Sequence, residues 1–249
     1  MKFSIITCTW NSEPYLAQSI ESVLSQDYPD IEYIFVDGGS SDGTLDRIRS
    51  LQRPYVLLEN VGGGISRAMN EGIKAATGDV IAHLHSDDYY LHPQVLSHVA
   101  REMERSGRQW VIGAMVKDRD GSQVPVARSA AAYSFASLLG GNYTVPHPAT
   151  FVSRALFERA GLFDEKLRYA MDWDLWLRIG ATGEIPAELA EPLAAFRTHP
   201  GSLSTRRIFA ARREELKVRY RYARHAPLAF MASLGRYVVR TGRLWLERA

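Results

Sequence analysis

The fold is decided by residues 31–44, IEYIFVDGGSSDGT, where a nearly continuous apolar run ends in a loop of glycine, serine and aspartate. A short apolar run of this kind is typical of a parallel strand that is covered on both faces. The loop is a dense turn signal, and we expect a helix after it, to about residue 52. This stretch therefore predicts a strand, a loop and a helix in succession, the repeating unit of an α/β protein.

Similar units lie on both sides of this stretch. We expect strands at residues 3–8, 55–58 and 79–84, with helical patterns between them, and the last strand stops at HSDD, residues 85–88. This order predicts a doubly wound, mostly parallel sheet of Rossmann-like topology. Right-handed crossovers place the loops after the strands along one edge of such a sheet. Asp37 and the pair Asp87–Asp88 should therefore lie on the same edge.

The second half of the chain is less regular. We expect a hairpin around Asp120–Gly121, a strand at 150–152, a helix at 172–179 and a last strand at 193–197. The sequence has no repeat and no clear linker before about residue 205. We therefore predict an α/β domain at residues 1–205, followed by a basic, helical extension at residues 206–249.

The composition excludes several classes of protein. Of the 249 residues, 46% are hydrophobic and 23% are charged, which is typical of a globular chain and not of a disordered one. No apolar run reaches the length of a transmembrane helix, about 18 residues, and residues 1–6 lack the features of a signal peptide. Cys8 is the only cysteine, which excludes intrachain disulfides and cysteine-rich zinc sites. These features fit a cytoplasmic protein.

Charge is unevenly distributed along the chain. Residues 206–249 contain twelve Lys/Arg and three Asp/Glu, a formal charge of +9, whereas the rest of the chain carries −7. Apolar residues are interleaved with these arginines, so the extension could be an amphipathic segment that binds an anionic membrane surface. The alternative is a helical hairpin packed on the body or on a second subunit. The acidic body and the lack of a recognition motif argue against nucleic acid.

Acidic residues at the predicted strand and helix ends have two interpretations each. The adjacent carboxylates of Asp87 and Asp88 could hold a hard divalent cation together with phosphates, or could stabilise the start of the following helix. Asp37 could accept hydrogen bonds from a ribose or a base, or could only form a tight turn. Asp172, at the start of a predicted helix, could be a general base or could complement the helix dipole.

The loop that follows the last predicted strand adds basic and hydroxyl groups. Arg197, His199 and Ser202 are of the residue types that bind a diphosphate or a metal ion. Taken alone, His199 could also be an ordinary surface histidine.

Together these segments resemble glycosyltransferase family 2, whose members use nucleotide sugars and have the GT-A fold. The resemblance covers about residues 3–205. The stretches that carry it are SIITCTWN (4–11), YIFVDGGSSDGT (33–44), AMNEGI (68–73), GDVI (78–81), LHSDD (84–88), HPATF (147–151), GLFDE (161–165) and DWDLWLR (172–178).

The resemblance implies roles for individual residues. Asp172 matches the position of the family's catalytic base, and Asp88 that of a metal ligand. His199 would be a second metal ligand, for Mn²⁺ or Mg²⁺. The residues implied to bind the nucleotide are Thr7, Thr9, Asn11 and Asp37, around the base and ribose, and Asp87, which forms the family's acidic metal-binding motif with Asp88. Those implied to close over the diphosphate are Arg197, His199 and Ser202.

The resemblance also implies a reaction. An inverting, metal-dependent enzyme would move a sugar from a nucleoside-diphosphate donor, with a UDP-sugar expected, to a hydroxyl of a saccharide acceptor. The acceptor would be linked to a lipid such as polyprenyl diphosphate. The enzyme would act in bacterial surface polysaccharide synthesis. It would be a peripheral protein on the inner face of the cell membrane, and it could be an oligomer.

Two positions depart from the family's pattern and keep other interpretations open. Arg67 stands where many relatives have an acid, and Met171 stands where relatives often have Glu. A degenerate member that binds nucleotide sugars as a sensor or scaffold is therefore an alternative. A nucleotidyltransferase is a second alternative, but the expected triphosphate-binding loop after the first strand is absent from the sequence.

Overall fold

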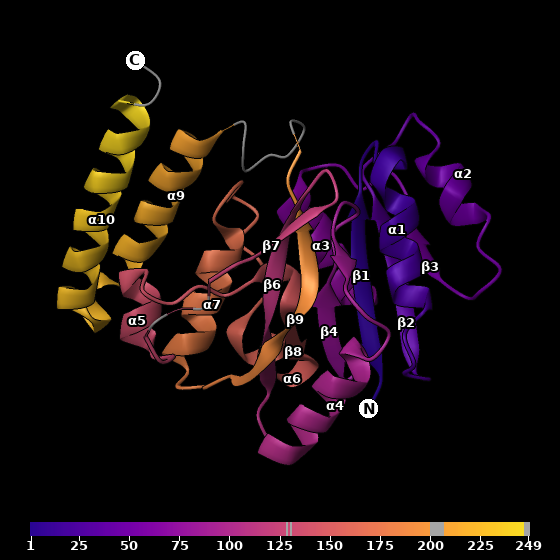
Figure 1. Ribbon diagram of the computed structural model, residues 1–249, viewed down its shortest axis with the longest axis horizontal. Helices are drawn as coiled ribbons and strands as arrows, with labels where there is room; N and C mark the ends of the chain where they lie inside the picture. The colour runs from indigo at the N-terminus through magenta and orange to yellow at the C-terminus, as the bar shows by residue number, and fades with distance from the viewer. Residues whose placement is uncertain (128, 130, 200–206, 247–249) are drawn as a thin grey trace.

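The computed structural model describes residues 1–127, 129, 131–199 and 207–246, except for the side chains of Arg240 and residues 243–246. In this part of the chain, nine strands form one sheet with helices on both faces (Figure 1). The strands of the sheet are, in spatial order, β3 (Val56–Leu58), β2 (Ile31–Asp37), β1 (Phe3–Thr9), β4 (Val80–His83), β8 (Thr150–Ser153), β6 (Trp110–Arg119), β9 (Ala187–Arg197) and β5 (Tyr89–Tyr90), with β7 (Ser122–Pro125) paired to β6.

Strand direction explains where the polar loops meet. β1 pairs in parallel with β2 and with β4, and β2 pairs in parallel with β3. β8 is antiparallel to both β4 and β6, so β6 and its parallel partner β9 run in the same direction as β1. The ends of β1, β2, β4 and β9 therefore lie at one edge of the sheet, which we call the carboxyl edge. The predicted α/β architecture is confirmed.

Two apolar cores lie on the two faces of the sheet. Ile6 and Ile34 pack with Met69 on one face, whereas Ile5 and Phe35 belong to the core on the other face. This alternation follows from the two-residue period of a strand. The helices are α1 (Glu13–Leu24), α2 (Thr44–Arg49), α3 (Ile65–Ala75), α4 (Val95–Ser106), α5 (Phe135–Gly140), α6 (Arg154–Ala160), α7 (Met171–Ala181), α9 (Ile208–Arg221) and α10 (Pro227–Leu246), with short 3₁₀ turns at His147–Ala149 and Ala223–His225.

Gly72 sets the distance between α3 and the sheet. A Cβ atom at this position would lie 2.5 Å from Cγ2 of Ile6, much closer than side-chain atoms normally approach. Any larger residue at position 72 would therefore push α3 away from β1. The start of α3 lies over the carboxyl edge, so this close packing also positions part of the site.

Two elements were not predicted, and one is longer than predicted. β5 and α5 are too short, at two and six residues, to give a periodic pattern. β9 begins at Ala187 and not at residue 193, because two register shifts against β6 interrupt the alternation that marks a strand. The predicted hairpin is present as β6 and β7.

The described part of the extension forms two helices that pack on the body. α9 and α10 lie side by side and contact α5 and α7 (Figure 1). Arg219 is buried in this contact and donates to the carbonyl groups of Leu138 and Leu139, and Nε of Arg236 donates to the carbonyl of Gly140 at 2.9 Å. This arrangement corresponds to the packed helical hairpin, one of the two interpretations of the extension that the sequence allowed. The domain boundary near residue 205 stays a prediction.

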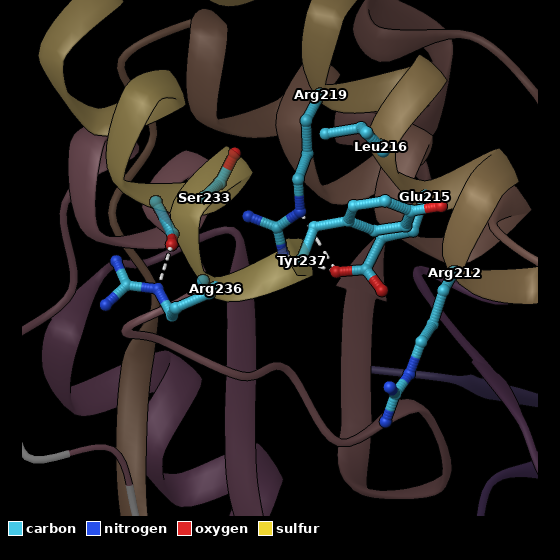
Figure 2. Close-up of a pocket in the computed structure, with 9 residues that line it drawn as sticks. Arg212, Glu215, Leu216, Arg219, Ser233, Arg236 and Tyr237 are labelled. Carbon is cyan, nitrogen blue, oxygen red and sulfur yellow. Dashed lines mark hydrogen bonds and ion pairs between the residues drawn. The ribbon is translucent and has the colours of Figure 1, made fainter. Parts of the chain in front are cut away.

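Between the hairpin and α5 lies a pocket with charged walls. Figure 2 shows its lining residues, among them Arg212, Glu215, Arg219 and Arg236. Glu215 forms an ion pair of 2.7 Å with Arg219. On the outside of α10, Leu228 and Met231 are exposed, as are Val238 and Val239. Among the residues that the structure describes, no helix combines the length and the apolarity that a membrane span requires.

Candidate active site

Asp37 ends β2 and organises the loop that follows it. Its side chain is 0% exposed. Oδ2 accepts hydrogen bonds from Oγ1 of Thr9 at 2.8 Å and from Oγ of Ser40 at 2.6 Å, and Oδ1 accepts from the backbone N–H groups of Gly39 and Ser40 at 2.9 and 2.8 Å. Both oxygens are therefore occupied by neighbouring groups. Asp37 and Thr9 hold the loop in shape at the carboxyl edge.

Thr7 and Asn11 also make internal hydrogen bonds. Thr7 is fully buried, and its hydroxyl donates to the carbonyl of Leu84 at 2.7 Å, which ties β1 to the segment that leads to Asp87. Asn11 has a φ of 49°, a left-handed conformation that Asn tolerates better than most residues. Its Oδ1 accepts from the N–H of Ser41 at 2.9 Å. These two residues thus connect the loops of the edge to one another.

Trp10 is a residue of this edge that the sequence did not single out. Its side chain is 70% exposed, although it lies between the buried Thr9 and the strained Asn11. A Cβ atom added to Gly38 would lie 3.5 Å from Cδ1 of Trp10, so the indole lies beside the loop of Asp37. A large exposed aromatic surface at a strand end can stack on a planar ligand. Sequence alone could not distinguish this Trp from a buried one.

Asp88 is buried but only partly paired. The side chain is 1% exposed, Oδ1 accepts the backbone N–H of Arg197 at 3.0 Å, and Oδ2 has no hydrogen-bond partner among the described residues. Burial raises the pKa of Asp88 well above its usual range, and the charge of Asp87 raises it further. A buried acceptor without a protein partner can be satisfied by a bound ion or by an ordered water. An oxygen donor of this kind fits Mg²⁺ or Mn²⁺.

The residues after β9 gather beside Asp87. Nε2 of His199 lies 3.1 Å from Oδ2 of Asp87, and its ring lies 4.5 Å from that of Tyr15. The guanidinium of Arg197 lies 5.0 Å from the ring of Tyr15 and 5.2 Å from that of Tyr89. Within the described ranges, Asp87, Asp88 and His199 do not place three ligand atoms within 4.8 Å of one another. Ser202 lies outside the described residues.

Asp172 and Asp174 have different environments at the start of α7. Oδ1 of Asp172 accepts the N–H of Trp173 at 2.7 Å. Burial raises the pKa of Asp172 to about 6, and the nearby charge of Glu215 also raises it. Asp174, in contrast, forms ion pairs with Arg178 at 2.9 Å and Arg221 at 3.2 Å. Asp174 therefore ties α7 to α9, whereas Asp172 is suited to exchange a proton near neutral pH.

Glu214 of α9 fixes the segment before Asp172. Its Oε1 accepts the N–H groups of three successive residues, Arg168 at 2.8 Å, Tyr169 at 2.9 Å and Ala170 at 3.1 Å. On the other side, Oγ of Ser66 in α3 donates to the carbonyl of Leu167 at 2.9 Å. No pattern in the sequence indicates this role, because Glu214 lies in the basic extension about forty residues further on.

His147 connects the two halves of the site. Its ring is stacked on that of His85 at 5.1 Å and lies 6.0 Å from that of Trp176, one turn of α7 after Asp172. Both ring nitrogens are buried and have no hydrogen-bond partner among the described residues. Burial keeps the pKa of His147 well below its usual value, so the ring is neutral. His147 therefore lies near both the segment that leads to Asp87–Asp88, through His85, and α7, through Trp176.

Two further positions are those at which the sequence departs from the family pattern. The side chain of Arg67 covers Gly63, since a Cβ atom there would lie 2.7 Å from Cδ of Arg67. Met171 is buried in the core next to Asp172. Neither residue adds a carboxylate to the site.

Comparison with known proteins also finds similarity to glycosyltransferases along much of the chain. The family described as glycosyl transferase family 2 matches residues 4–159. The uncharacterized glycosyltransferase EpsJ of Bacillus subtilis is 30% identical over 93% of this chain and 70% of its own length. The uncharacterized glycosyltransferase RT0329 of Rickettsia typhi is 31% identical over 70% of this chain. This alignment spans only 57% of the rickettsial protein.

Solved structures share the fold at low sequence identity. S. aureus TarS 1–349 in complex with UDP-GlcNAc superposes with a TM-score of 0.72 and 22% identity, over 88% of this chain and 66% of that one. The mannosyltransferase PcManGT from Pyrobaculum calidifontis, in complex with GDP-Man and Mn²⁺, has a TM-score of 0.69 and 19% identity, over 97% and 75% of the two chains. The predicted GT-A fold is therefore confirmed.

Proposed function

The chain belongs to glycosyltransferase family 2, and from this premise we propose that it moves a sugar from a nucleoside-diphosphate donor to a hydroxyl of a saccharide acceptor. The observation that carries the proposal is a pair of carboxyl groups, the buried Asp88 and the half-buried Asp172, whose segments both lie near His147. Asp88 keeps one oxygen without a partner, and Asp172 has a pKa of about 6. One group fits a cation and the other fits a proton.

Asp172 is the proposed general base. With a pKa of about 6 it is ionised at neutral pH, yet it is a much stronger base than an ordinary Asp. It takes the proton of the acceptor hydroxyl while that oxygen bonds to the anomeric carbon. The bond from this carbon to the diphosphate oxygen breaks on the opposite face. A single displacement of this kind inverts the anomeric configuration and needs no covalent intermediate.

Asp87, Asp88 and His199 are the proposed metal-binding groups. The unpaired Oδ2 of Asp88, the carboxylate of Asp87 and the ring of His199 offer oxygen and nitrogen donors to Mn²⁺ or Mg²⁺. A bound divalent ion supplies positive charge for the departing diphosphate. Arg197, held between Tyr15 and Tyr89, adds a permanent positive charge on the same side.

The base of the donor is proposed to stack on Trp10. The exposed indole beside Gly38 offers a flat apolar surface at the carboxyl edge. Asp37, Thr9, Thr7 and Asn11 hold the loops around this surface. TarS was solved with UDP-GlcNAc and PcManGT with GDP-Man, so a UDP-sugar or a GDP-sugar is the donor to test first.

The acceptor is proposed to be linked to a lipid, and the enzyme to act at the inner face of the membrane. The apolar side chains of Leu228 and Met231, and of Val238 and Val239, are exposed on α10 and follow one another along the helix. The extension also carries a formal charge of +9. An exposed apolar stripe with cationic residues in its sequence suits binding to an anionic bilayer.

A thermal-shift panel tests the proposed activity. Nucleoside diphosphates and nucleotide sugars are added to the full chain with and without Mn²⁺, and the release of nucleoside diphosphate is measured for each donor. We expect one donor to raise Tm only when Mn²⁺ is present, and to be turned over. Binding without turnover with any saccharide acceptor would favour a sensor or scaffold. No shift with any donor would contradict the proposal.

A further inference from the structure

A second group of metal-ligand side chains lies away from Asp88. It consists of His92, His98 in α4 and Glu191 in β9, whose ligand atoms all lie within 4.8 Å of one another. Nδ1 of His98 contacts Oε1 of Glu191, and Nε2 of His92 lies 3.9 Å from Oε2 of the same carboxylate. The two imidazole rings are 5.5 Å apart. The carboxylate thus presents one oxygen to each histidine.

A β-bulge places Glu191 in this position. Gly113 of β6 pairs with Leu189, but the next residue, Ala114, pairs with Pro192, so Ala190 and Glu191 have no partner on β6. A bulge bends its strand and redirects the side chains within it. β9 packs against α4, which carries His98. The bulge therefore brings Glu191 to the two histidines. It is also the reason why the sequence pattern did not predict the first half of β9.

The backbone holds His92 in place before any ion binds. The carbonyl of His92 accepts Nε2 of Gln26 at 2.9 Å, and the carbonyl of Pro93 accepts the N–H of Asp27 at the same distance. Pro93 also restricts its own φ and the conformation of His92. His98 thus comes from α4 and Glu191 from a strand of the sheet, whereas His92 comes from the loop before α4 that these hydrogen bonds hold in place. Rigid elements of this kind make a more precise site than a loop does.

The charges around the cluster favour a cation. In the part of the chain that the structure describes, the carboxylate of Glu191 lies against His92 and His98 and forms no ion pair with a lysine or arginine. The three side chains are 28%, 27% and 38% exposed, in the order His92, His98 and Glu191, so that an ion can enter and water can complete its coordination.

We propose that His92, His98 and Glu191 form a Zn²⁺ site. Two imidazoles and a carboxylate are ligands that zinc accepts, with bonds of about 2.0–2.2 Å and a water molecule in the fourth position. A tetrahedral ion with such bonds keeps its ligand atoms about 3.3 Å apart, which a small rotation of the side chains provides. The Asp87–Asp88 pair, in contrast, offers oxygen ligands that suit Mg²⁺ or Mn²⁺.

The position of the cluster suggests a structural role. His92 follows Asp88 by four residues, and Glu191 precedes Arg197 by six. These two segments pair as β5 and β9, and their far ends meet where Oδ1 of Asp88 accepts the N–H of Arg197 at 3.0 Å. An ion between His92 and Glu191 would fasten the near ends of the same two segments. It would thereby hold Asp88 and Arg197 in register without touching a substrate.

The test uses Co²⁺ as a spectroscopic substitute for Zn²⁺ on the full chain, in an Asp88→Asn background that weakens the other metal site. We expect one equivalent of Co²⁺ to give the intense visible absorption bands of a Co²⁺ ion with few ligands. Zn²⁺ should displace the Co²⁺, and it should raise Tm. His98→Gln and Glu191→Gln should each weaken Zn²⁺ binding by at least about tenfold.

His225→Gln is the matched control, because His225 is a histidine of the second 3₁₀ turn that lies outside the cluster. It should leave the Co²⁺ spectrum and the affinity for Zn²⁺ unchanged. Using two substitutions, on α4 and on β9, guards against a fold defect in either one, which the Tm without metal also reveals. An unchanged Co²⁺ spectrum in both His98→Gln and Glu191→Gln, or no Zn²⁺ binding in the parent protein, would overturn the proposal.

Discussion

Asp37 and Asp88 are both buried at the carboxyl edge of one sheet, but their surroundings differ. The two oxygens of Asp37 accept four hydrogen bonds from Thr9, Gly39 and Ser40. Asp88 accepts one, from Arg197, and its second oxygen has no partner among the described residues. A buried carboxylate whose oxygens are occupied stabilises a loop, whereas an oxygen without a protein partner can accept a bound ion or an ordered water. The number of hydrogen bonds that each carboxylate accepts thus distinguishes Asp37, which stabilises its loop, from Asp88, which is proposed to bind a cation.

The same comparison applies at the start of α7. Asp174 is held by Arg178, Arg221 and Tyr222, whereas Asp172 forms no ion pair within the described residues and accepts the adjacent N–H of Trp173. Comparing single substitutions of one carboxylate of each kind therefore distinguishes those that stabilise the fold from those that are available to bind or react.

Asp88→Asn should give the largest effect on turnover. It removes the negative charge that would hold the cation, and a bound metal contributes several kcal/mol to catalysis, so kcat/KM should fall about 10³-fold. The folded state should lose little stability, because a neutral amide replaces a buried carboxyl group that has one unpartnered oxygen, and the amide oxygen can still accept the N–H of Arg197. Release of nucleoside diphosphate and Tm, measured on the same samples, check both expectations. Turnover near that of the wild type would remove Asp88 from the site.

Asp37→Ala should show the opposite pattern, with the main loss in stability. Four donors would lose their acceptor in a buried loop, which should lower the free energy of unfolding by about 2–4 kcal/mol. Asp87→Ala is the control, because this side chain is 30% exposed and its ion pair with His199 should contribute less than about 1 kcal/mol. Urea unfolding measures the difference. Equal losses in the two variants would erase the distinction drawn between framework and ligand-binding acids.

Glu214→Gln should slow transfer without affecting donor binding. The loss of charge weakens three hydrogen bonds to the segment before Asp172, so kcat should fall about tenfold, as is usual when a supporting hydrogen bond is lost. The donor KM should stay near the wild-type value. Steady-state kinetics at saturating acceptor give both constants, and a change confined to KM would argue against this positioning role.

The pH dependence of turnover should report on Asp172. Because the base must be ionised, kcat/KM should rise with pH through a midpoint of about 6. The charge of Glu215 raises this pKa, so Glu215→Gln should move the midpoint to lower pH. A rate that does not change between pH 5 and 8 would mean that another group accepts the proton.

The smallest expected effect is a gain in stability from Asp172→Asn. Folding raises the pKa of Asp172 from its ordinary value to about 6, so the fold favours the protonated form. Ionisation therefore destabilises the folded protein, increasingly as pH rises from about 4 to 6, and constantly above that. The variant should have a higher Tm than the wild type at pH 7.5, and a smaller gain at pH 5. A lower Tm at pH 7.5 would contradict the assigned shift.

The sequence predicts those features of the fold and the site that depend on local patterns, and not those that depend on contacts between distant residues. The apolar runs predict the strands, and the direction of parallel strands predicts that Asp37 and Asp87–Asp88 share an edge. The occupied state of Asp37 was not predictable, because it depends on the hydroxyls and amides of residues that fold around it.

Contacts between distant segments were also beyond sequence reasoning. Glu214 lies in an extension whose sequence left membrane binding and a packed hairpin as alternatives, and Glu191 reaches the two histidines only through a bulge. The extension's two helices could be expected from its composition, but their packing on α5 and α7 could not. The part of the site built from strand ends was thus predictable, and the part built by packing was not.

The most direct test of the account compares Asp172→Asn with Asp174→Asn, using the donor that the thermal-shift panel identifies. Mn²⁺-dependent donor binding and the rate of single-turnover transfer are measured on the same samples. We predict that Asp172→Asn binds the donor like the wild type but transfers about 10²–10⁴-fold more slowly, whereas Asp174→Asn loses Tm and keeps its transfer rate in the fraction that remains folded. Wild-type transfer by Asp172→Asn would contradict the account.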